Sequence, residues 1–286
     1  MSVIHLPDGN RAGLFGTVGI SGLILLVMSG GGCAAGGPTA EPVRAPEQIE
    51  APQTRYEQEG QRIAANPVTY LREVYARVDA LGQYQLRFYR QERLGGRLRP
   101  LEHIRAWFRK EPFSVKFVWE DEDADYYESV YVANQNAGKL IVRERKGALP
   151  LLPPTTRKLD PMLPVKLGRA RNPITDFGLA RVTARTLLPF EDPALNEQMT
   201  IEYQGLVRLE PQDRPAHHLR IDRPRPVPGI EYTRQDFYVD ADTGLPAGTD
   251  LYLPAGELGA RYRYAEVDFS VQLSDADFEL STAGKK

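Results

Sequence analysis

Cysteine is almost absent from this sequence: Cys33 is the single thiol among 286 residues, so no disulfide can form within the chain. An exported fold would therefore depend on its hydrophobic core alone. A large excess of one charge is lacking too, because the formal net charge is only -2, which argues against bulk electrostatic binding of nucleic acid. Apart from residues 12–28, no apolar run approaches the length of a membrane span.

Motifs for catalysis and metal binding are also missing. The chain has no Gly-x-Ser-x-Gly elbow, His-Glu-x-x-His helix or Gly-x-x-x-x-Gly-Lys phosphate loop. His217 and His218 are adjacent on a predicted strand, so they point to opposite faces and cannot share a metal ion. We expect no catalytic residue, no metal and no cofactor, and therefore not an enzyme. A hydrolase of envelope polymers stays open as an alternative without a residue to nominate.

The amino-terminal region has the layout of a secretory signal. A polar start ends at Arg11, the apolar run follows, and Ser29 and three glycines precede Cys33. This ending resembles the lipobox of bacterial lipoproteins, which implies cleavage before Cys33 and acylation of that residue. Gly30 departs from the pattern, which usually has leucine there. Because a helix over the run would be only about 25 Å long, a permanent membrane anchor is a weaker reading. A third alternative is a secreted protein without a lipid anchor.

The region after Cys33 is rich in proline, glycine and alanine, a composition that cannot offset the entropy of ordering. The predicted organisation is a signal peptide (1–32), a disordered tether (33–65) and one domain (66–286). The resemblance implies a monomer in the cell envelope, facing the periplasm and bound to a membrane through its lipid. Ala34 stands where some inner-membrane lipoproteins have aspartate, which favours the outer membrane.

Two helices are predicted in the domain. Asn66 is a good N-cap, Pro67 suits the first helical position, and apolar residues follow at helical spacing up to Gly82. A second helix is expected to begin at Asn172 and Pro173 and to stop at Pro189.

Short alternating segments predict about ten strands without an alternating strand–helix pattern. The expected fold class is α+β: one large, curved antiparallel sheet with the two helices on its concave face. Two strands supply the candidate lining of an apolar cavity on that face: Phe113, Val115, Phe117 and Trp119 on the first, and Tyr203 and Val207, grouped with Ile201 and Leu209, on the second. The alternative for each residue is an ordinary place in a packed core.

Two stretches near the carboxyl end carry a family resemblance. Residues 237–246 end in an Asp-x-x-Thr-Gly-Leu-Pro turn, and residues 264–278 end in leucine, Ser-Asp and phenylalanine. This pairing resembles the LolA/LolB-type carriers of outer-membrane lipoproteins. The whole segment 67–280 resembles a bacterial family of unknown function, DUF1571, best at residues 109–115, at Lys139 and at 172–179.

The resemblance implies an unclosed β-barrel whose apolar concave face holds acyl chains, and it supplies no catalytic residues. The expected function is a membrane-anchored envelope lipoprotein that binds a lipid, or the acyl chains of another lipoprotein, as a carrier or receptor. The alternative is a protein-interaction or sensing module on the same scaffold, without a ligand.

Overall fold

The computed structural model describes residues 47–48, 54–145, 155–192, 195, 199–223 and 231–281. All of them belong to one compact unit, Pro42–Lys286. The predicted signal peptide, Cys33 and most of the predicted tether lie outside the described residues.

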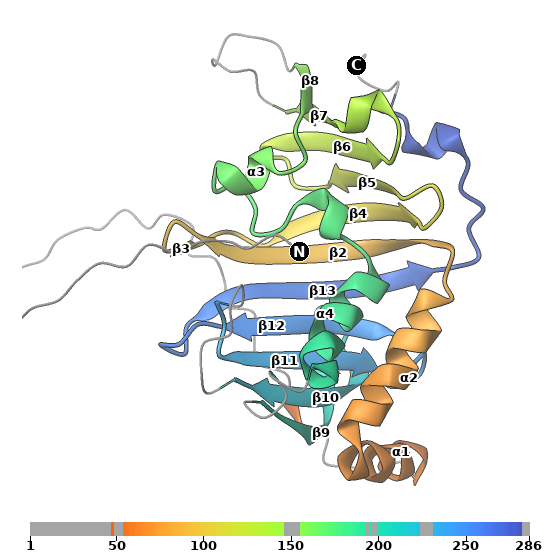
Figure 1. Cartoon of the computed structure of the whole chain (residues 1–286), viewed down its shortest axis with the longest axis vertical. Coiled ribbons are helices and arrows are strands. Elements are labelled where there is room, and N and C mark those ends of the chain that lie inside the picture. Colours follow the sequence, from red (N-terminus) through yellow and green to blue (C-terminus); the bar gives the residue numbers. More distant parts are fainter. Residues whose placement is uncertain are drawn as a thin grey trace, which may run out of the picture. The chain divides into compact units, whose positions relative to one another are not determined.

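One antiparallel sheet organises the described part of the chain (Figure 1). Its strands are β1 (Glu47–Gln48), β2 (Gln83–Leu94), β3 (Arg97–Leu98), β4 (Glu102–Arg109), β5 (Ser114–Trp119), β6 (Tyr126–Val132), β7 (Leu140–Glu144), β8 (Thr156–Leu159), β9 (Thr200–Leu209), β10 (Arg214–Asp222), β11 (Arg234–Asp240), β12 (Pro246–Tyr252) and β13 (Leu258–Asp268). The order is β1-β9-β10-β11-β12-β13-β2-β4-β5-β6-β7-β8, and β3 pairs with β2. Because β1 and β8 are at opposite ends of this order, the sheet is not closed. The predicted fold class is confirmed.

The helices are α1 (Thr54–Ala65), α2 (Pro67–Asp79), α3 (Leu163–Lys166) and α4 (Leu179–Glu191), with 3-10 turns η1 (Asn136–Gly138), η2 (Ile174–Asp176) and η3 (Asp275–Phe278). The start of α2 is as predicted, since Asn66 Oδ1 accepts a hydrogen bond from the Thr69 N–H at 3.0 Å. Figure 1 shows α2 and α4 crossing one face of β10–β13, and we call this face of the sheet the inner face. None of the helices in the described part of the chain combines the length and apolar composition needed to cross a membrane.

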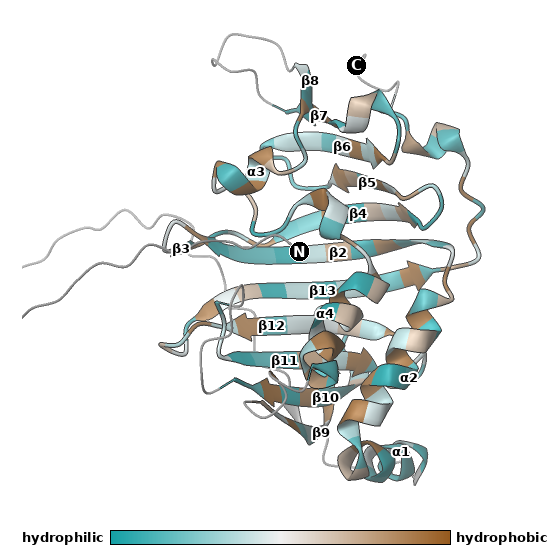
Figure 2. Ribbon diagram, in the orientation of Figure 1, coloured by the Kyte–Doolittle hydropathy of each residue, from teal (hydrophilic) through white to brown (hydrophobic). Residues whose placement is uncertain are grey.

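The inner face carries the main hydrophobic core. One cluster joins α2 and the beginning of α4 to β2, β4, β5 and β13 through residues such as Val78, Leu179 and Phe88. A second cluster packs the rest of α2 and α4 on β10 and β11. Hydrophobic and hydrophilic positions alternate along the strands, whereas α1 is largely hydrophilic (Figure 2).

The outer face is covered at β4–β6 by the segment that follows β13. Phe278 packs there on Val130 and Val132, and Lys116 Nζ donates to the backbone oxygen of Glu279 at 2.6 Å. Glu128, fully buried, accepts from Ser281 on the same segment. The segment after β13 therefore covers part of the outer face, at β5 and β6.

Three predictions about the helices need correction. Residues 54–65 of the expected disordered tether form α1, where Ile63 is fully buried. The second helix begins at Leu179 and not at Asn172, because Gly178 has a backbone φ of +134°, outside helical geometry. Pro189 does not stop α4, which continues to Glu191 with Pro189 in its last turn.

Candidate apolar ligand site

Aromatic side chains gather on the inner face, and we call this set the aromatic floor: Phe88 on β2, Phe108 on β4, Phe117 and Trp119 on β5, and Tyr262 and Tyr264 on β13. Phe88 lies at its centre, with its ring centroid 5.9 Å from Phe117, 5.9 Å from Tyr262 and 5.6 Å from Tyr264. Aromatic pairs at such separations each contribute about 0.5–1.5 kcal/mol beyond simple burial.

The β5 candidates lie on this face together, as their alternation indicates. Val115, Phe117 and Trp119 are 0%, 4% and 5% exposed, and Phe113 is half-buried with its ring 5.7 Å from Phe108. These side chains pack as a core, which is the alternative the sequence left open. A ligand can reach them only if a covering group moves.

The cover over the floor is a short segment and not a long helix. Residues 160–178, which we call the cover segment, lead from β8 into α4 and lie in front of β2, β4 and β5 in Figure 1. Phe177 inserts from this segment, with its ring centroid 4.8 Å from Phe117, 5.3 Å from Phe88 and 6.5 Å from Phe108. Phe177 was not predicted to be a contact between the cover segment and the floor.

Glu92 links the cover segment to the sheet through hydrogen bonds. Its carboxylate is buried and accepts hydrogen bonds from the Tyr262 hydroxyl at 2.6 Å and from the Arg171 N–H at 3.1 Å. The same hydroxyl oxygen accepts from Asn172 Nδ2 at 3.3 Å. Burial, followed by the charge of Glu92, raises the pKa of Tyr262 well above its ordinary value, so the hydroxyl stays protonated and able to donate.

A neighbouring ion pair fixes the edge of the floor. Trp119 Nε1 donates to Glu102 Oε1 at 2.9 Å, and Glu102 also accepts two hydrogen bonds from Arg90, at 2.6 and 3.1 Å. A two-bond pair of this kind holds the carboxylate in one orientation. The indole therefore has a defined position on the floor.

The joint between cover segment and α4 is tightly constrained. A Cβ on Gly178 would lie 3.0 Å from Phe108 Cε2, so only glycine allows this approach and this φ. Directly after it, the Leu179 N–H donates to the buried Tyr84 hydroxyl at 2.8 Å. Gly178 inside a predicted helix was the available signal of this break.

The other two lining candidates do not belong to one surface. Tyr203 pairs with Leu219 on the inner face, whereas Val207 pairs with Ala216 and packs with Tyr238 on the outer face. A β-bulge causes the change, because the register shifts between His218 and Leu219. The prediction that Tyr203 and Val207 line one cavity is therefore wrong, and neither belongs to the hydrophobic cluster of the aromatic floor.

The two histidines do point to opposite faces. His217 is buried on the inner face, where its Nδ1 lies 2.9 Å from the Tyr203 hydroxyl, and His218 Nε2 lies 3.1 Å from Asp236 on the outer face. Burial lowers the pKa of His217. Within the described ranges, no group of three or more His, Cys, Asp or Glu side chains is placed to hold a metal ion.

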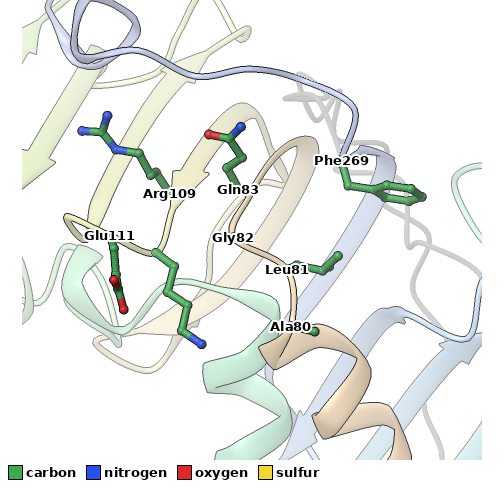
Figure 3. A pocket seen from close by; sticks show the side chains of 8 residues that line it. Ala80, Leu81, Gly82, Gln83, Arg109, Glu111 and Phe269 are labelled. Carbon is green, nitrogen blue, oxygen red and sulfur yellow. The ribbon is translucent and has the colours of Figure 1, made fainter.

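Two surface hollows lie away from the centre of the floor. One, of about 530 Å³, lies beside the end of α2 and is lined by Leu81, Arg109, Lys110 and Phe269, among others (Figure 3). The other, of about 540 Å³, is bordered by Trp119 but lies mainly against polar side chains of the outer face. Both are open and about half polar, so neither has the character of a site for an acyl chain.

Comparison with known proteins assigns the family. Residues 81–283 match the model described as "Protein of unknown function (DUF1571)", so the chain belongs to this family. No curated protein matches the chain.

Solved structures with a similar arrangement share little sequence with this chain. They include MucB (17% identity, 76% of this chain and 63% of that chain, TM-score 0.44). Others are the lipoprotein LppX of Mycobacterium tuberculosis (10%, 73% and 100%, TM-score 0.40) and a LolA superfamily protein of Nitrosomonas europaea (10%, 74% and 96%, TM-score 0.26). This chain thus spans less than two thirds of the length of MucB.

Proposed function

We propose that this protein binds an apolar ligand, a lipid or the acyl chains of a lipoprotein, between the aromatic floor and the cover segment. The observation that carries the proposal is the unequal covering of the inner face. Most of α2 and α4 packs on β10 and β11, whereas the rings on β2, β4 and β5 are contacted by Phe177 of the cover segment and by only the adjoining ends of α2 and α4.

Movement of this segment would expose a broad apolar surface without unfolding the sheet. Its attachments include the Phe177 ring contacts, the buried Ile174, and hydrogen bonds to Glu92, Tyr262 and Tyr126. The first part of the segment is exposed, since Leu167 is 59% exposed and Met162 is 41% exposed. Segments with few buried contacts open at a lower free energy than the core.

The proposal includes the place of action. The lipobox-like sequence at Cys33 supports a lipoprotein of the cell envelope, held to a membrane by its acyl chains and facing the periplasm. A carrier or receptor that is itself anchored then takes its ligand at a short distance from the membrane.

A second candidate, a protein-interaction or sensing module, is favoured by one observation. Val115, Phe117 and Trp119 are at most 5% exposed, so the floor is filled when the cover segment is in place. In this reading the cover segment never leaves the floor, and partners bind the exposed surface.

Ligand extraction distinguishes the two. The purified protein is extracted with organic solvent, analysed by mass spectrometry, cleared of lipid on a hydrophobic resin and titrated with a fluorescent fatty acid. A stoichiometric lipid and saturable probe binding support the carrier, and the absence of both supports the interaction module.

A further inference from the structure

Arg223 is a buried cation with unused donors. It follows β10 and is 1% exposed. Its Nη2 donates to Gln235 Oε1 at 3.0 Å, and its guanidinium carbon lies 4.8 Å from the centroid of the Tyr232 ring. Among the described residues, no hydrogen-bond partner is present for Nε or Nη1, both of which are buried. One N–H on Nε and two on Nη1 are therefore available to an acceptor.

No described carboxylate lies within ion-pair distance of Arg223. The neighbouring Asp222 instead accepts a hydrogen bond from Arg220 at 2.9 Å, and both of these side chains are about 40% exposed. Burial lowers the pKa of Arg223, which expresses how unfavourable the unpaired charge is. Buried charges in proteins are ordinarily paired, so an arginine in this position indicates an anion that completes the site.

The surroundings hold the guanidinium in place on the inner face. Gln235 Nε2 donates to Thr186 Oγ1 on α4 at 2.9 Å and to Thr249 Oγ1 on β12 at 3.2 Å. These bonds fix the amide, so that its oxygen faces Arg223 and the remaining donors of Arg223 are directed elsewhere. Such a preset side chain loses little conformational entropy on binding.

Arg223 is also connected to the aromatic floor. Tyr232, whose ring lies under the guanidinium, packs against the hydrophobic cluster that contains Phe88, Leu251 and Tyr262. An amphiphile with its charged end at Arg223 would thus have apolar side chains along its path to the floor.

We propose that Arg223 binds the carboxylate of a fatty-acid-like ligand whose tail lies on the aromatic floor. The inference rests on the proposed function and adds the chemical class of the ligand, an amphiphile with one anionic end group. A hydrogen bond from a guanidinium to an ionised acceptor is about twice as strong as one between neutral groups. The site should therefore distinguish an acid from its ester.

The test compares three probes on the purified, lipid-free full chain: a fluorescent fatty acid, its methyl ester and acetate. The wild-type protein should bind the acid at least about tenfold more tightly than the ester, the factor that corresponds to one charge-assisted hydrogen bond of ~1.4 kcal/mol. Arg223→Met should bind both forms equally, at the affinity of the ester. Arg220→Met, which removes a more exposed arginine near the end of β10, should keep the preference.

Each other outcome has a defined meaning. Equal wild-type binding of acid and ester, or a preference that survives Arg223→Met, overturns the role of Arg223 and leaves the proposed function intact. Binding of neither form overturns both. If acetate displaces the fatty acid at similar concentrations, Arg223 belongs to a site for small anions, and the proposal of an amphiphilic ligand is overturned.

A stability measurement separates binding from a structural role. If Arg223 serves a ligand, Arg223→Met should change the midpoint of thermal unfolding of the lipid-free protein little, because removal of an unpaired buried charge offsets loss of the hydrogen bond to Gln235 Oε1. A lowered midpoint together with unchanged probe binding shows that Arg223 serves the fold, and contradicts the inference.

Discussion

Replacing Phe177 by alanine should tighten ligand binding while it weakens the fold. A fully buried phenylalanine replaced by alanine costs about 3–5 kcal/mol, and because Phe177 is only half-buried we expect about 2 kcal/mol. Its ring contacts with Phe88 and Phe117, at 5.3 and 4.8 Å, carry much of this free energy. All of it stabilises the cover segment on the floor.

A ligand that must displace the cover segment binds in proportion to the open population. A loss of about 2 kcal/mol from the closed state raises that population, and hence the apparent affinity, by up to ~30-fold. Titration with a fluorescent fatty acid measures the affinity, and native-state hydrogen exchange measures the opening of residues 168–178. Leu167→Ala, which truncates an exposed side chain of the same segment, is the matched control and should change neither.

The opposite pattern would refute this reasoning. If Phe177→Ala lowers the free energy of unfolding but leaves probe affinity unchanged, then Phe177 is a fixed part of the core. Faster exchange spread over the whole sheet, and not confined to the cover segment, would lead to the same conclusion.

Three further predictions concern other parts of the chain. Gly178→Ala should lower the free energy of unfolding in urea by more than about 1 kcal/mol, because Gly178 has a φ of +134° and a Cβ there would lie 3.0 Å from Phe108. The control Gly82→Ala, with open space around it, should have little effect. Equal losses of stability in the two variants would contradict this prediction. Burial lowers the pKa of His217, so the unfolded chain takes the proton more readily. Stability should therefore fall as the pH drops below about 6.5, and His217→Gln should remove up to about 1 kcal/mol of the loss between pH 6.5 and 5.5; unchanged pH dependence would argue against it. Cys33→Ser should abolish incorporation of labelled palmitate in a bacterial host, and retained label would exclude Cys33 as the acylated residue.

Local sequence patterns predicted the elements that depend on local physics. The start of α2 at Asn66 and Pro67 follows from capping chemistry, which involves only neighbouring residues. The inner-face position of Val115, Phe117 and Trp119 follows from strand alternation without a bulge.

Features set by distant contacts could not be read in this way. α1 has few apolar residues and is held by tertiary contacts, among them the close approach of Gly60 to the Tyr203 ring. The bulge that separates Tyr203 from Val207 breaks the alternation, although Gly205 within that strand was a hint.

The candidate site was predicted only in part. The alternation of apolar residues predicted which side chains of β5 lie on the floor. It did not predict the residues of the cover segment or those that hold it in place. The contacts of Phe177 and Glu92 are with residues 60 or more positions away, and Arg223 is notable for its unpaired donors. A long-range contact and an unpaired donor leave no pattern in the local sequence.

The two tryptophans lie on opposite faces and allow the most direct test of the central claim. Trp119 belongs to the aromatic floor, whereas Trp107 packs on the outer face with the carboxyl-terminal segment. Trp107→Phe and Trp119→Phe each leave one indole, whose fluorescence is followed during titration with a brominated fatty acid that quenches on contact. The account predicts saturable quenching of Trp119 and none of Trp107. Quenching of Trp107 alone, or of neither, would contradict a ligand site on the inner face.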